Sequence, residues 1–151
     1  MLNWLNKFNW GKGAMLGVIY ALIALVIRQI EAALTMGYYQ DPTYFGTWSP
    51  LMMPAAGPPP GSFYLISLVF SLFTGLSLAV FYFFVREVLP GKRKLTALYF
   101  SKMVIGLMLI LGFLPMYLMI NLPVGLLVSW FISGSIIIIL YSLVVVKVLD
   151  K

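Results

Sequence analysis

Four long apolar runs divide this chain, and polar or proline-rich stretches separate them. The runs cover about residues 14–36, 62–85, 95–118 and 124–146. Each is long enough to cross a hydrocarbon core about 30 Å thick as a helix. The pattern predicts an all-α integral membrane protein, in which residues 1–151 form a single domain built as a four-helix transmembrane bundle.

Small residues recur at intervals of four in three of the runs. Stripes of this kind let two helices approach closely, although a row of hydroxyl groups could also line a narrow polar path. We expect helix contacts at these positions, whereas the aliphatic second half of the last run is expected to face lipid. The stripe residues are Gly17 and Ala21 in the first run, Ser67, Ser71, Gly75 and Ala79 in the second, and Gly125, Ser129 and Ser133 in the fourth.

The segments outside the first run carry many aromatic rings. Before it, Trp4, Phe8 and Trp10 stand beside lysines, which predicts a short interfacial anchor over residues 1–13. After it, the stretch 37–61 has six prolines and no Lys or Arg, so a regular helix is disfavoured there.

The aromatic content of residues 37–61 favours an ordered outer loop over a disordered one. Long loops without regular structure are commonly functional covers, but a belt of rings that anchors the bundle at the headgroups explains the pattern equally well. The candidate residues of this outer cap are Tyr38, Tyr39, Asp41, Tyr44 and Trp48.

The basic residues predict the orientation of the spans. Of ten Lys and Arg residues, eight lie in the N-terminal segment, the connection between the second and third runs, or the C-terminus. The positive-inside rule therefore places both termini in the cytoplasm, most naturally at the plasma membrane. Because the cations flank apolar spans and form no stripe with interleaved rings, nucleic acid is not an expected partner despite the net charge of +6.

The composition disfavours catalysis. The chain has no Cys, no His and only four acidic residues among 151, so the usual metal ligands, thiolate nucleophiles and neutral-pH general bases are missing. We expect no enzyme, no metal site and no cofactor.

One polar cluster, Arg28, Gln29 and Glu31, interrupts the first run. Arg28 and Glu31 are three residues apart, so they share a helix face and can pair, while Gln29 points elsewhere and could bond to another helix. One interpretation is an ion pair that sets the register of the helix beneath the outer loop, with Tyr or Ser hydroxyls as second partners. The other is a site where Glu31 takes up a proton and Arg28 holds an anionic headgroup or solute, because charges inside a membrane are commonly functional.

These observations predict a non-catalytic, multi-pass binding or assembly subunit. Its expected partners are the lipid bilayer and either a second copy or another membrane protein, with a lipid-like or hydrophobic ligand under the outer loop. The alternative is an oligomeric small transporter or channel that uses Arg28 and Glu31, because four helices alone enclose little space.

Overall fold

The computed structural model describes residues 7–54 and 58–150, and all regular secondary structure within these ranges is helical. The elements are α1 (Trp10–Leu34), α2 (Met36–Gln40), η1 (Pro42–Thr47), α3 (Gly61–Val85), η2 (Arg86–Val88), α4 (Arg93–Met108), η3 (Leu109–Phe113), α5 (Leu114–Met119) and α6 (Val124–Leu149). Four stretches are long and apolar enough to cross a membrane, namely Trp10–Leu34, Gly61–Val88, Arg93–Met119 and Val124–Leu149. The prediction of an all-helical chain with four potential spans is confirmed.

The first helix begins earlier than the apolar pattern suggested. Asn9 is its N-cap, and the Asn9 side-chain oxygen accepts a hydrogen bond from the backbone N–H of Lys12 at 3.0 Å. Phe8 is only 3% exposed and packs edge-on against Phe83 of α3. Within the predicted anchor, Phe8 therefore belongs to the core of the bundle, and Trp4 lies outside the described residues.

The third span changes its helical geometry near Pro115. Helix α4 continues into a π-helical turn, η3, and then into α5, which carries Pro115 in its first turn. In a regular helix the Pro115 ring would meet the carbonyl of Leu111, four residues earlier. Since Leu111 lies within the widened turn, the π geometry accommodates the proline without ending the helix.

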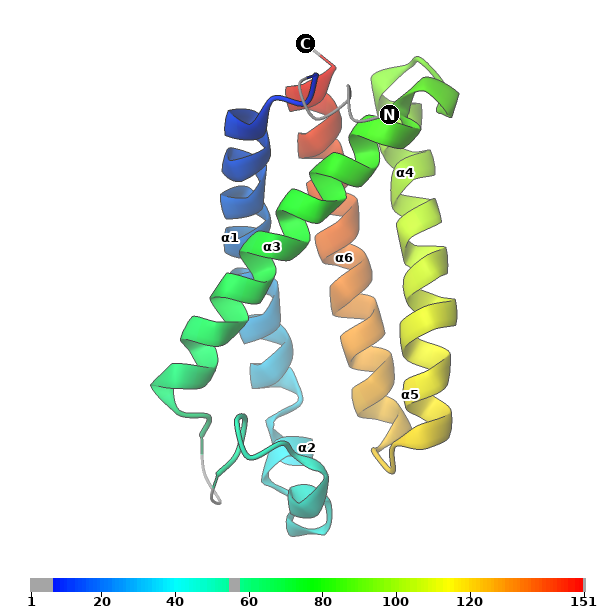
Figure 1. Ribbon diagram of the computed structural model, residues 1–151. Coiled ribbons are helices and arrows are strands. Elements are labelled where there is room, and N and C mark those ends of the chain that lie inside the picture. The colour runs from blue at the N-terminus through cyan, green and yellow to red at the C-terminus, as the bar shows by residue number, and fades with distance from the viewer. Residues whose placement is uncertain (1–6, 55–57, 151) are drawn as a thin grey trace.

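The other three long spans pack around α6 (Figure 1). Helix α6 lies between α1 and α4, and α3 crosses α1 obliquely. The first residues of α1 and the last residues of α6 lie at the same end as η2, which we call the terminal end, while α2 and η1 lie at the opposite end, which we call the loop end.

Helices α1 and α6 run antiparallel in one continuous register. Lys12 Nζ donates to the Val148 carbonyl at 3.1 Å, and the Tyr20 and Tyr141 rings meet edge-on at 5.2 Å. Further along, Arg28 Nη1 donates to Ser133 Oγ at 3.0 Å. In these pairs the two residue numbers add to 160 or 161, as expected of antiparallel helices with equal rise per residue.

One face of the second half of α6 is core, contrary to the expectation that this half faces lipid, while Ile136 and Ile139 on its other face are exposed. Ile137, Ile138, Val145 and Val146 are buried, and the Tyr141 hydroxyl donates to the Gly75 carbonyl of α3 at 2.6 Å. The reason is the central position of α6, which contacts α1 on one side and α4 on the other. Hydropathy alone does not separate a central apolar helix from one exposed to lipid.

The contact between α1 and α3 centres on two glycines, both members of the predicted stripes. A Cβ atom at Gly17 would lie 2.8 Å from the Leu72 carbonyl oxygen, and one at Gly75 would lie 2.9 Å from the Gly17 Cα. The two backbones therefore touch at this crossing, as small-residue stripes permit.

We expect Gly17→Ala to destabilise the fold by about 1–3 kcal/mol, because the added methyl group meets backbone atoms that cannot rotate away. The measurement is the free energy of unfolding in mixed detergent micelles titrated with dodecyl sulfate. Gly106→Ala is the matched control, because a Cβ atom at Gly106 meets nothing within 4 Å. Equal stability of the two variants would contradict the close crossing.

Candidate functional site

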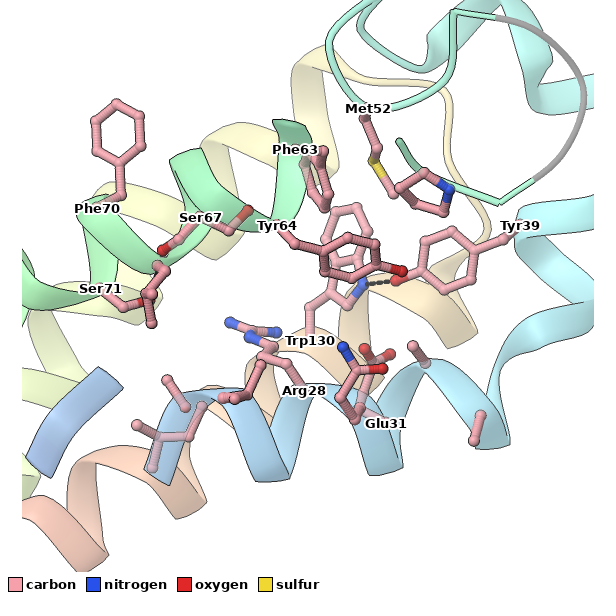
Figure 2. Close-up of a pocket in the computed structure, with 18 of the residues that line it drawn as sticks. Arg28, Glu31, Tyr39, Met52, Phe63, Tyr64, Ser67, Phe70, Ser71 and Trp130 are labelled. Carbon is pink, nitrogen blue, oxygen red and sulfur yellow. Dashed lines mark hydrogen bonds between the residues drawn. The ribbon is translucent and has the colours of Figure 1, made fainter. Parts of the chain in front are cut away.

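A cavity of about 1070 Å³ occupies the loop end of the bundle. It lies between α1, α3, α6 and the third span, and the segment after α1 covers it (Figure 2). Most of its wall is apolar or aromatic, including Phe63, Met108, Phe113 and Phe131. Its volume is slightly above the range of about 300–1,000 Å³ that is usual for small-molecule sites.

The cavity exists because α3 diverges from α1 beyond their crossing. Gly75 and Ala79, on the terminal side, are buried in the contact between helices. Ser67 and Ser71, on the loop side of the same stripe, are half-buried and line the cavity. The predicted stripe thus divides into two surfaces, one that packs against α1 and one that lines the cavity.

Arg28 rises from α1 into the cavity (Figure 2). Its Nη1 donates a hydrogen bond to Ser133 Oγ of α6. Its Nη2 lies beside Gly134, because a Cβ atom added to Gly134 would be 3.8 Å from Nη2. The remaining surface of Arg28 is exposed. Ser133 was expected to be a packing residue, and in the structure it is the hydrogen-bond partner of the guanidinium.

Glu31 is the most buried charged residue of the site, with 7% of its surface exposed. Its Oε1 accepts hydrogen bonds from Ser129 Oγ at 2.5 Å and from Thr35 Oγ1 at 3.0 Å. Among the described residues no ion pair forms between Arg28 and Glu31, so the interpretation that pairs them directly is wrong. The α6 register explains this, because it brings two hydroxyls, Ser129 and Ser133, to the two charges.

Gln29 also lines the cavity and is exposed. Within the described part of the chain it makes no hydrogen bond to another helix, in contrast to the expected cross-helix bond. Ala21, from the α1 stripe, is buried and forms part of the same wall.

Three aromatic rings join the loop segment to α6. Tyr39 of α2 stacks on Trp48 with the ring centroids 5.3 Å apart, and the Tyr39 hydroxyl accepts a hydrogen bond from Trp130 Nε1 at 2.6 Å (Figure 2). Tyr39 and Trp48 are both buried. Burial raises the pKa of the Tyr39 hydroxyl above its ordinary value, so the hydroxyl stays protonated near neutral pH.

The other cap candidates have local structural roles. The Asp41 side chain caps η1 by accepting the Thr43 backbone N–H at 2.9 Å, and this bond lowers the pKa of the Asp41 carboxyl. The Tyr38 hydroxyl lies against Gly125, where a side chain would collide with it. Tyr44 packs against the buried cluster of Tyr39, Trp48 and Leu126. Of the five cap candidates, Tyr39 alone lines the cavity.

Several site residues carried no sequence signal of their own. Trp130, Met108 and Phe113 line the cavity, but each is an ordinary apolar residue of a span. Thr35, whose hydroxyl donates a hydrogen bond to Glu31, stands at the end of the first apolar run. One sequence signal was usable. Ser129 and Ser133 are four residues apart, about one helical turn, and Arg28 and Glu31 are three residues apart. These similar spacings allow two polar pairs to form between antiparallel helices.

The comparisons with known proteins identify no relative. The chain matches no protein-family model, no curated protein and no solved structure.

Ser129→Ala should lower stability by about 0.5–2 kcal/mol, the range found for hydrogen bonds between helices in membrane proteins. The reason is that Glu31 would keep only Thr35 as a hydroxyl partner. The unfolding titration with dodecyl sulfate measures the change, and a double-mutant cycle with Glu31→Gln isolates the pair. Ser135→Ala is the control on the same helix, since the Ser135 hydroxyl bonds the Phe131 carbonyl of its own helix. A loss no larger than that of the control would contradict the contact.

Proposed function

We propose that this protein is a non-catalytic membrane subunit that holds a lipid-like, hydrophobic ligand in the cavity beneath the loop segment. The single observation that carries the proposal is a cavity of about 1070 Å³ with a largely apolar wall. Such a space is costly to leave as an empty void and unfavourable to fill entirely with water, because most of its wall is apolar. An apolar ligand resolves both difficulties.

The surroundings of the cavity favour entry from a bilayer. Its wall includes Phe70 of α3, which is 68% exposed, and Met116 of α5. Helix α3 packs on α1 at the crossing, and the third span packs on α6. The side of the cavity between α3 and the third span therefore has no helix across it, and a hydrophobic molecule could pass there directly from lipid.

We place the protein in the plasma membrane with both termini in the cytoplasm. The support for the orientation is the distribution of cations, since Arg86 begins η2, Arg93 begins α4 and Lys147 lies in the last turn of α6, all at the terminal end. In this placement the loop segment and the cavity face the outer leaflet. Large exposed apolar side chains on the described helices, such as Leu22, Phe73 and Ile132, suit contact with lipid, a second copy or another membrane protein.

A bulky residue at Ser67 tests ligand binding directly. Ser67 lines the cavity and its side chain makes no hydrogen bond within the described residues, so Ser67→Phe fills the space without removing a polar contact. We expect several-fold less copurified lipid-like ligand, measured by native mass spectrometry after extraction in a mild detergent. Ser77→Phe is the matched control, because Ser77 is exposed on the same helix and lies outside the cavity.

No bound ligand in the parent protein, or equal amounts in the two variants, would refute the proposal. Size-exclusion chromatography of both variants shows that the bundle remains folded.

The alternative function is transport or conduction through an oligomer. The charges at Arg28 and Glu31 favour it, because charged side chains within a span are often part of a substrate or proton path. In this case Glu31→Gln should abolish pH-dependent flux into proteoliposomes while the protein still folds. Glu87→Gln, outside the cavity, serves as the control. Flux that is absent from the parent, or unchanged in Glu31→Gln, would reject transport.

A further inference from the structure

We propose that the ligand is an amphiphile with an anionic headgroup, a carboxylate or a phosphate, and that Arg28 binds this group. The inference rests on the proposed function, because it names the chemical class of the molecule in the same cavity. It assigns to Arg28 the role of selecting the headgroup, because an apolar lining alone does not distinguish one headgroup from another.

Arg28 has unused donors. A guanidinium carries five N–H donors, and in the described part of the chain its one hydrogen bond is to Ser133 Oγ. The side chain is exposed and lines the cavity. Its remaining N–H groups can therefore reach a ligand without breaking a contact of the fold.

The negative charge nearby does not take up these donors. Glu31 is 93% buried, and its Oε1 already accepts from Ser129 and Thr35. Among the described residues that line the cavity, Arg28 and Glu31 are the charged ones. The charge that is accessible to a ligand is therefore the positive one.

An apolar setting makes this cation a strong anchor for an anion. A charge without a partner in a low-dielectric region is costly, and a guanidinium binds carboxylate and phosphate oxygens with two parallel hydrogen bonds. A neutral ligand would cover Arg28 and leave its donors unpaired. An anionic headgroup satisfies both the charge and the donors.

The position of Arg28 suits an amphiphile. The α1 residues that line the cavity run from Tyr20 to Ala33, which is about 20 Å at 1.5 Å per residue. Arg28 lies near the middle of this stretch, with Ala24 and Leu25 on the terminal side and Ala32 on the loop side. A headgroup at Arg28 thus leaves apolar wall in both directions for a hydrocarbon tail.

The test compares two ligands that differ only in the headgroup. Trp130 lines the cavity, so its fluorescence reports a brominated tail nearby. The probes are ω-bromododecanoic acid and ω-bromododecanol, titrated into the full chain in nanodiscs of zwitterionic lipid at a pH where the acid is ionised. Trp4→Phe and Trp10→Phe remove two of the four tryptophans, so that the signal comes from Trp130 and the adjacent Trp48.

We expect the acid to bind roughly tenfold more tightly than the alcohol, the gain typical of a charge-assisted hydrogen bond. Arg28→Gln should abolish this preference, and Arg28→Lys should keep part of it. Lys102→Gln is the matched control, because Lys102 is a cation within the third span that lies outside the cavity. Glu31→Gln should strengthen binding of the acid. Among the described residues that line the cavity, Glu31 is the only one with the same negative charge as the ionised acid.

The outcomes separate the inference from the proposed function. Equal binding of acid and alcohol in the parent would overturn the inference and leave hydrophobic ligand binding intact. Quenching by neither probe above the level seen with Ser67→Phe would overturn both. The comparison of acid with alcohol in the parent needs no variant, so it decides the question even if Arg28→Gln fails to fold.

Discussion

The contact between α1 and α6 is the constraint on which the rest of the structure depends. In a hydrocarbon setting neither Arg28 nor Glu31 can stay without a polar partner at low cost. The two hydroxyls of α6, Ser133 and Ser129, meet them at 3.0 and 2.5 Å. A shift of α6 by one residue would rotate both hydroxyls away by about 100°. The polar contacts therefore select one register along the whole helix pair.

That register determines where the other two long helices can pack. Helix α1 presents Gly17 to Gly75 of α3, and α6 presents Tyr141 to the carbonyl of the same glycine. On its other side α6 packs against α4. From the crossing at Gly75, α3 diverges from α1 toward the loop end (Figure 1). The cavity lies where the two helices have separated.

The loop segment and the cavity are coupled by aromatic contacts. Trp130, in the cavity wall, donates to Tyr39, which stacks on Trp48. A ligand that touches Trp130 would therefore touch the element that holds the loop segment in place. Helix α6 thus supports the register, through Ser129 and Ser133, and holds the loop segment, through Trp130. The cavity wall and the loop segment that covers it therefore depend on a single helix.

Much of the fold was predictable from local sequence. Four apolar runs of sufficient length mark four helices, because a stretch of about 20 apolar residues suits a membrane-spanning helix. Gly17, Gly75 and Ala79 were predictable as contacts, since small residues at intervals of four allow backbones to touch. The apolar run, which begins at about residue 14, predicts a later start for α1 than the observed Trp10, because the Asn9 cap lies outside the run.

The sequence by itself determined the number of potential spans, the positions of the small-residue stripes and the presence of two charges in the first span, but not the short helices α2 and η1 in the proline-rich segment where a regular helix was disfavoured. Only the tertiary structure decided what those charges contact, that α6 is central, and that one stripe divides between packing and a cavity. The physical reason is that hydropathy and spacing are properties of one helix. Partners depend on register and crossing geometry between helices, such as the alignment that brings Ser129 to Glu31.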